Sequence, residues 1–124
     1  MDKMTTDKVT VAEKLSRFDE PWSPKIVGEL NGQHVKLVKL QGDFTWHHHE
    51  REDEMFYVVS GRMIMKLRDR DVSVDPGEFI IIPRGVEHMP CAPDGASVML
   101  FEPASTLNTG NVRSERTREH LERL

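Results

Sequence analysis

Three adjacent histidines and a nearby glutamate have the types and spacing of a metal-binding site. His47, His48 and His49 follow one another, and Glu54 lies five residues beyond the last of them. Side chains alternate between the two faces of a β-strand, so in a strand His47 and His49 point to one side and His48 to the other. Two imidazoles on one strand face and a carboxylate on a nearby strand can hold a transition metal, and His88 is available as a further ligand.

Glu54 is informative because of its neighbours. Residues 50–53 are too charged to be buried, which suits the tip of a hairpin, and Glu54 then begins the returning strand. By alternation, Glu54 shares a face with Phe56 and Val58. A carboxylate that faces an interior among apolar side chains is costly unless it is paired or bound to a metal.

The histidine segment leaves two alternatives open. A single β-bulge would shift the alternation and exchange the roles of His47 and His48. Alternatively, His47 and His49 belong to a polar strand on a solvent-exposed sheet face and bind nothing. His34 and His120 are isolated, and isolated histidines are usually surface groups or hydrogen-bonded core groups.

From position 25 onward, short extended segments alternate with turn residues. Asn31-Gly32 is a strong hairpin signal, and Pro76-Gly77 and Pro83-Arg84-Gly85 also mark turns. The intervals are too short for the crossover helices of a parallel sheet. An all-β antiparallel barrel or sandwich of about nine strands is therefore predicted. The expected strands are 26–30, 35–40, 44–49, 54–59, 62–67, 72–74, 78–82, 88–91 and 97–102.

Segments of different character flank these strands. Residues 10–13 have the form of a capping box, and a short helix over 11–17 is predicted before Pro21 and Pro24. Residues 113–124 alternate charges of both signs, which is typical of a short exposed helix or a frayed end. The predicted organisation is an N-terminal lead over 1–24, a barrel over 25–103 and a polar C-terminal tail over 104–124.

Two motifs, in this order between residues 33 and 102, resemble those of the cupin family. The first is Gly42-x4-His47-x-His49-x4-Glu54-x6-Gly61, and the second is Gly77-x5-Pro83-x-Gly85-x2-His88. There are two departures from the usual pattern. The first glycine is one residue nearer the histidine pair, and Ala92 stands where many cupins carry asparagine. The chain is thus similar to the small single-domain cupins of type 2.

This resemblance implies a fold and a ligand set. The fold is an antiparallel jelly-roll barrel, also called a double-stranded β-helix. The ligands are three histidines and one glutamate around one divalent transition metal per subunit, and they carry over to His47, His49, Glu54 and His88. Imidazole suits Fe, Mn, Ni, Zn, Co and Cu, and four protein ligands leave an octahedral ion two positions for water or substrate.

The resemblance also implies a function. A small-molecule metalloenzyme of the isomerase, epimerase or dioxygenase type is expected, with its substrate in the barrel. The alternative is a non-catalytic protein that binds or senses a small molecule with the help of the metal, and a storage or structural protein is a weaker third reading. No catalytic residue is assigned. Glu102, near the end of the last strand, is a candidate general acid or base whose alternative role is a surface or capping carboxylate.

The composition limits which partners and which cellular compartment are expected for the protein. The 124 residues carry a net charge of -4 without a basic block, which argues against nucleic acid as a partner. No apolar run approaches the ~18 residues that span a bilayer, and the N-terminus lacks the apolar stretch of a leader. Cys91 is the single cysteine, so an internal disulfide is excluded and a cytoplasmic location is expected. A buried thiol is predicted there.

Apolar side chains on the strand faces opposite the ligands need a cover. This outward set is Phe44, Trp46, Met55, Tyr57 and Val59. The cover is either the N-terminal lead, with Phe18 and Trp22, or a second subunit. Cupins commonly dimerise through such faces, so a homodimer is predicted. The side chains expected in the lumen are Phe56, Val58, Met63, Met65 and Met99.

Overall fold

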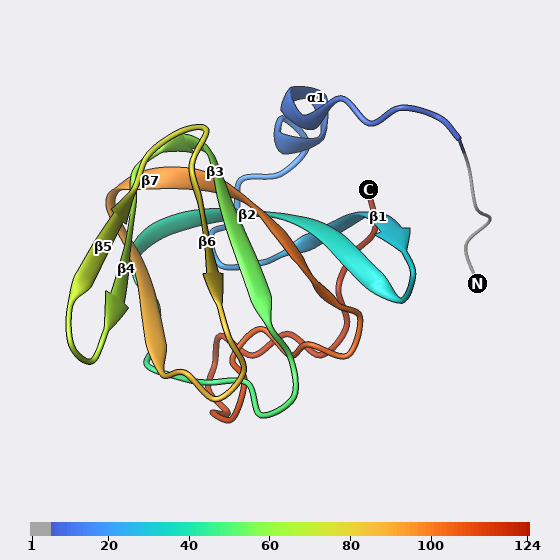
Figure 1. Cartoon of the computed structure of the whole chain (residues 1–124). Helices are drawn as coiled ribbons and strands as arrows, with labels where there is room; N and C mark the ends of the chain where they lie inside the picture. The colour runs from blue at the N-terminus through green and yellow to red at the C-terminus, as the bar shows by residue number, and fades with distance from the viewer. Residues whose placement is uncertain (1–5) are drawn as a thin grey trace.

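The computed structural model describes residues 6–124, so the first five residues of the predicted lead lie outside the described residues. Within this range the chain forms a short helix and seven strands (Figure 1). The elements are α1 (Val11–Leu15), β1 (Lys25–Leu30), β2 (Gln33–Asp43), β3 (Glu54–Gly61), β4 (Met63–Leu67), β5 (Asp71–Val74), β6 (Phe79–Ile82) and β7 (His88–Pro103). None of the helical residues in 6–124 forms a stretch long and apolar enough to cross a bilayer.

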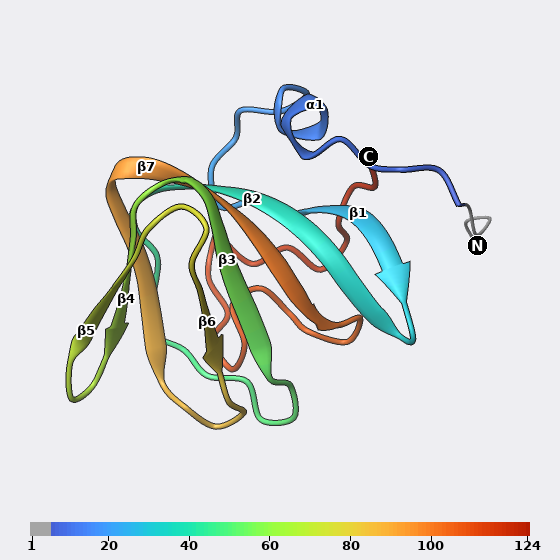
Figure 2. The ribbon, with the colours of Figure 1, turned by 45° about the horizontal axis from the view of Figure 1, so that its top comes forward.

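The long strand β7 connects the two parts of an antiparallel sheet. The strand order is β1-β2-β7-β3-β6, and β4 pairs with both β5 and β7. The first residues of β7 pair with β4, whereas its later residues lie between β2 and β3. Because β7 bends along this course, the sheet curls over itself (Figures 1 and 2). The result is the all-β antiparallel jelly-roll barrel that the sequence predicts.

The segments 88–91 and 97–102 belong to one strand, although they were predicted as two separate strands. β7 pairs with β2 on both sides of this point. Residues 93–95 stand opposite Gln41 alone, so they bulge out of the ladder without ending the strand. The side-chain amide of Gln41 donates to the carbonyl oxygen of Pro93 at 3.2 Å and holds the bulge in place.

The segment 44–49 is extended but is not the predicted strand. It runs beside the start of β7, where the N–H of Phe44 donates to the carbonyl oxygen of Pro90 at 3.1 Å. Pro90 has no N–H to return this bond, so the ladder is interrupted there. Pairing resumes only at a single isolated bridge between His47 and His88.

Apolar side chains from both parts of the sheet fill the barrel. The buried core consists of Trp22, Val38, Leu40, Phe56, Val58, Met63, Met65, Val74, Ile82, Ala92, Val98 and Leu100. The prediction that Met63 and Met65 lie inside is confirmed, since both are fully buried. The same prediction for Met99 is wrong. Val98 and Leu100 take the inward positions, and alternation places Met99 on the other face.

The prediction that Phe44 faces outward is also wrong. Its ring stacks on that of Trp22, with 4.7 Å between centroids, and packs against the core. Trp22 is itself buried, and its indole N–H donates to the carbonyl oxygen of Gln41 at 2.9 Å. This part of the N-terminal lead therefore packs into the barrel and does not cover its outer face. The guanidinium of Arg68 lies over the ring of Trp46, with 3.8 Å between Cζ and the ring centroid.

The outer face of the sheet carries two rows of apolar side chains across β6, β3, β7 and β2. The first row is Ile81, Met55, Phe101 and Val35, and the second is Phe79, Tyr57, Met99 and Leu37. Exposure is greatest on β6, where Phe79 is 59% and Ile81 54% exposed. β6 is an end strand of the path β1-β2-β7-β3-β6, so this face extends to an edge of the sheet.

The C-terminal tail runs back along the barrel, as Figure 1 shows in red. Its last residues pair with β1: the N–H of Ile26 donates to Glu122, and the N–H of Leu124 donates to Ile26, both at 2.9 Å. Thr109 in the middle of the tail is fully buried. The tail is therefore docked and is not a frayed end.

The predicted tail helix is wrong, since residues 104–124 form turns and bends. The Asn108 side chain donates to the carbonyl oxygen of Arg116 and accepts from the N–H of Arg118, both at 2.8 Å. Such local bonds from asparagine, serine and threonine side chains compete with a helical ladder. α1 is likewise shorter than predicted. Thr10 makes no side-chain capping bond, and Glu13 pairs with Arg17 at 2.6 Å.

Candidate metal centre

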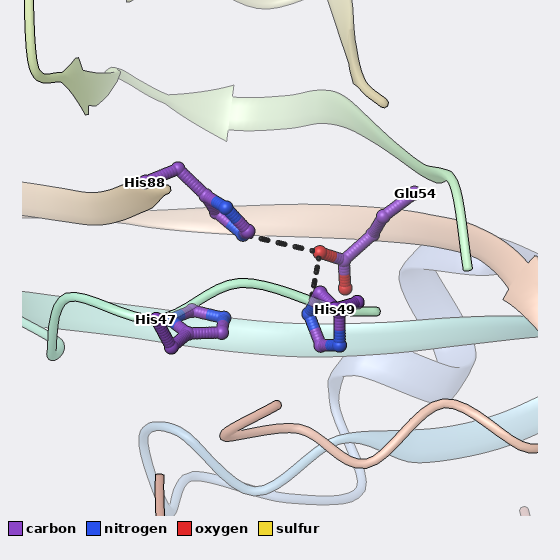
Figure 3. A group of neighbouring side chains, drawn as sticks. All are labelled: His47, His49, Glu54 and His88. Atoms are coloured by element: carbon purple, nitrogen blue, oxygen red, sulfur yellow. Dashed lines mark ion pairs between the residues drawn. The ribbon is translucent and has the colours of Figure 1, made fainter. Parts of the chain in front are cut away.

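Four buried side chains converge inside the barrel. His47 and His49 come from the extended segment after β2, Glu54 is the first residue of β3, and His88 is the first residue of β7. One donor atom from each lies within 4.8 Å of all the others. Each residue is less than 5% exposed. Figure 3 shows the three imidazoles and the carboxylate turned toward a common space. The structure thus brings together the four residues that the sequence named.

Two other parts of the chain, residues 85–88 and the C-terminal tail, hold the histidine segment. His47 and His88 exchange backbone hydrogen bonds of 3.0 and 2.9 Å. The N–H of Gly85 donates to the carbonyl oxygen of His49 at 2.7 Å. Between them, His48 is bonded through its backbone to Asn111 of the tail, at 2.8 and 3.0 Å. These hydrogen bonds fix the segment in place of a regular strand ladder.

Hydrogen bonds to backbone carbonyls orient two of the imidazoles. Nδ1 of His47 lies 2.9 Å from the carbonyl oxygen of Thr45, and Nδ1 of His88 lies 2.9 Å from that of Val86. A neutral imidazole has one N–H, so donation from Nδ1 leaves a lone pair on Nε2. This is the arrangement in which a carbonyl fixes the ring and the tautomer of a metal-binding histidine.

Three of the four donor atoms lack hydrogen-bond partners. Within residues 6–124, Nε2 of His49, Nε2 of His88 and Oε1 of Glu54 are buried and make no hydrogen bond. Glu54 Oε1 lies 3.3 Å from the first nitrogen and 3.4 Å from the second. Burying an unpaired polar atom costs about 1–3 kcal/mol. A divalent cation among these atoms would relieve that cost, so the donor set fits a metal ion.

Electrostatics keep two of the donors, His47 and Glu54, in the deprotonated form that binds a cation. Burial lowers the pKa of His47 to about 4, and the nearby His88 lowers it further, so this imidazole is neutral at pH 7. Burial acts to raise the pKa of Glu54, but contacts with His49 and His88 outweigh it and hold that pKa well below its usual range. Ligands that are already deprotonated bind a metal without first releasing protons.

A narrow cavity of about 40 Å³ adjoins the centre, enough for about three water molecules at ~10–15 Å³ each. His47 and Glu54 form part of its wall, and aromatic and aliphatic side chains form most of the remainder. Two further charged groups line it, Lys36 and Glu102, whose side chains pair at 3.2 Å. Burial, followed by the charge of Glu54, raises the pKa of Glu102 well above its usual range.

Sequence reasoning named Glu102 but missed Lys36. The signal for Lys36 was present, because it shares strand parity with Val38 and Leu40, which are apolar and buried. A lysine at an inward position calls for a partner. The surface or capping role considered for Glu102 is wrong, because Glu102 is 2% exposed and lines the cavity.

The remaining histidines and the cysteine lie outside the group of four. His48 points away from it, and its Nε2 lies 2.7 Å from Oε1 of Glu50. The alternative in which His48 replaces His47 as a ligand is therefore wrong, because His47 belongs to the group of four. His34 pairs with Glu29 at 3.2 Å. Cys91 is buried, as predicted, and burial raises the pKa of its thiol.

Comparison with known proteins places the chain in a family. The cupin domain matches residues 34–102. A solved structure of a cupin-2 domain containing protein from Shewanella frigidimarina superimposes with a TM-score of 0.76 at 39% sequence identity, over 77% of this chain and 93% of that one. The chain belongs to the cupin family.

Two relatives with known activities are more distant. Acireductone dioxygenase from Bacillus licheniformis is 33% identical over 64 residues, which are 48% of this chain and 36% of that protein. The 3-hydroxyanthranilate 3,4-dioxygenase of Bos taurus is 29% identical over 96 residues, which are 73% of this chain and 32% of that protein. The chain spans between 32% and 56% of the length of the curated relatives that it matches.

Proposed function

We propose that His47, His49, Glu54 and His88 bind one divalent transition metal per subunit, and that the protein is a metal-dependent dioxygenase of a small molecule. The observation that carries this proposal is the convergence of four buried donors beside a cavity, three of which have an unpartnered atom. Two relatives with dioxygenase activity favour oxygen chemistry over an isomerase or an epimerase.

The residues of the chain have distinct roles in this proposal. A bound metal of this kind supplies Lewis acidity and, where it is redox-active, the activation of dioxygen. The carbonyl oxygens of Thr45 and Val86 fix the rings of His47 and His88 through their Nδ1 atoms. The stacked rings of Trp22 and Phe44 exclude water from the cavity wall. Glu102 lies where it can hold or transfer a proton within the cavity.

Metal analysis followed by an oxygen-uptake screen tests this function. The protein is purified without a tag, its metal content is measured, and oxygen consumption is recorded with iron-loaded protein across a panel of small molecules. Bound iron and substrate-dependent oxygen consumption are expected. Turnover without oxygen uptake would place the protein among isomerases or epimerases. Tight binding of a small molecule without product would identify the metal-dependent binding or sensing protein.

We further propose that the protein is a cytoplasmic homodimer that does not bind nucleic acid. The exposed Phe79 and Ile81, at one end of the two apolar rows on the outer face of the sheet, support the dimer, because exposed apolar side chains are costly in water. A net charge of -4 without a basic block supports the absence of a nucleic-acid partner. The single thiol is compatible with a reducing compartment.

A further inference from the structure

The cavity beside the candidate metal centre contains a hydrogen-bonded pair, Lys36 and Glu102, that does not belong to the four candidate ligands. Lys36 of β2 and Glu102 of β7 are each 2% exposed, and Lys36 Nζ lies 3.2 Å from Glu102 Oε2. The other carboxyl oxygen, Glu102 Oε1, is buried and has no hydrogen-bond partner in residues 6–124. The lysine ammonium has three N–H donors, and its bond to Glu102 occupies one. The pair can thus form further hydrogen bonds with a ligand.

Stability alone does not explain this pair. A buried ion pair is often no more stabilising than apolar residues of similar volume, because both charges lose their hydration. The cavity wall around the pair is apolar, with Val38, Leu40 and Leu100 among its members. Two apolar side chains would therefore suit this part of the barrel. A few polar groups in an otherwise apolar pocket are typical of groups that orient a ligand.

The charges around the cavity favour an anion. A bound divalent ion and Lys36 together outweigh Glu54 and Glu102 by one positive charge, even when both carboxylates are counted as ionised. Imidazoles bind metals in their neutral form and add no charge. In a pocket with low-dielectric walls, a net charge attracts an oppositely charged ligand strongly.

We propose that Lys36 and Glu102 form the recognition site for the substrate, and that the substrate is a compact organic anion with a hydroxyl group beside its anionic oxygen. Lys36 donates to the anionic oxygen, and Glu102 Oε1 forms a hydrogen bond with the hydroxyl. This assignment rests on the proposed function, because the substrate shares the cavity with the metal. The cavity volume of about 40 Å³ restricts the ligand to a small molecule.

Glycolate and ethylene glycol are matched probes of this site. Glycolate carries the hydroxyl and the carboxylate side by side, whereas ethylene glycol is of similar size and neutral. Calorimetric titration of Zn²⁺-loaded protein is expected to detect binding of glycolate. The affinity for ethylene glycol is expected to be at least tenfold weaker. The affinities are then compared with those of two variants, Lys36→Met and the double variant Lys36→Met/Glu102→Leu.

The double variant separates recognition from folding. Lys36→Met alone leaves a buried carboxylate unpaired and is expected to lower the melting temperature. The double variant removes both charges, so it is expected to melt at or above the wild-type temperature, to bind Zn²⁺ in unchanged amount, and to bind glycolate at least tenfold more weakly. Lys39→Met is the control, since Lys39 lies on the same strand with the opposite parity and contacts the Phe18 carbonyl oxygen. It is expected to leave glycolate affinity unchanged.

Two results would overturn the recognition site. One is a double variant that binds glycolate within twofold of the wild type, and the other is a double variant that is strongly destabilised, which would make the pair structural. Metal content is measured in the same samples. A wild-type protein without bound metal would refute the proposed function, whereas a metal-loaded protein whose glycolate affinity is independent of Lys36 would refute only this inference.

Discussion

Asn111 and His48 exchange two hydrogen bonds although 63 positions separate them. The N–H of His48 donates to the side-chain oxygen of Asn111 at 2.8 Å, and the N–H of Asn111 donates to the carbonyl oxygen of His48 at 3.0 Å. His48 stands between the candidate ligands His47 and His49. The tail lies beyond the matched cupin domain, which ends at residue 102. A segment outside that domain therefore fixes the backbone of the ligand segment.

Replacement of Asn111 by alanine tests this role. Asn111→Ala removes the side-chain bond to His48, so we expect about tenfold weaker metal binding, the lower end of the range for groups that support ligands. Thr109→Val is the control, because it breaks a buried hydroxyl pair of 2.7 Å within the same tail. Both variants are expected to lose about 1–2 kcal/mol of stability. Chelator competition measures the affinity, and an equal loss in both variants would contradict the prediction.

Gly110 offers a second test of the same contact. Its φ is +56°, and an added Cβ would overlap the carbonyl oxygen of His48 and approach Cδ2 of His47 to 3.0 Å. Gly110→Ala is therefore expected to displace the ligand segment and to weaken metal binding by tenfold or more. Gly32→Ala is the matched control, since Gly32 has a φ of +75° with no atom within 4 Å of the added Cβ. Wild-type metal affinity in Gly110→Ala, measured by the same competition, would show that the tail contact does not set the ligand geometry.

Removal of His88 tests the ligand set. His88→Ala is expected to reduce metal content to less than about a tenth of the wild-type value, because His88 is fully buried among the other donors. Metal at a hundredfold excess over its dissociation constant is expected to stabilise the wild type by about 2.7 kcal/mol. The variant is expected to show no such gain in thermal unfolding. Unchanged metal content per subunit in His88→Ala would show that the assignment is wrong.

The pH dependence of the metal-free protein follows from His47. Its pKa is about 4 in the folded state and near 6.5 when unfolded. As pH falls from 6.5 to 4, the unfolded state binds a proton that the folded state does not, so stability falls by up to about 3 kcal/mol. Above pH 6.5 this contribution is constant. Urea unfolding of the wild type and of His47→Gln across this range measures the effect, and parallel curves for the two proteins would contradict it.

The apolar outer face of the sheet leads us to expect a homodimer. Phe79→Asp places a charge on the edge strand of the apolar face, next to Tyr57, and is expected to convert a dimer into a monomer. Leu30→Asp is the control, since Leu30 is a 43% exposed apolar residue at the end of β1. Light scattering after size-exclusion chromatography gives the mass. A wild-type protein that is monomeric at all concentrations would make the dimer prediction wrong.

The sequence by itself determined the fold class and which four residues could form the centre. Strand alternation has a period of two, so in an extended segment without a bulge His47 and His49 share a face. Glu54 was identifiable because a carboxylate in an apolar strand face is costly. The turn residues Asn31-Gly32 and Gly77 located strand ends, since they adopt conformations that other residues avoid.

The tertiary structure alone decided which distant segments meet. Strand parity placed Phe44 outside, but the irregular course after Asp43 turned it onto Trp22. The tail looked helical because local charge patterns carry no information about a partner that is 63 positions away. The pairing of Lys36 with Glu102 likewise depends on the register between β2 and β7. Contacts between remote residues are set by the packing of the whole sheet, which no local pattern encodes.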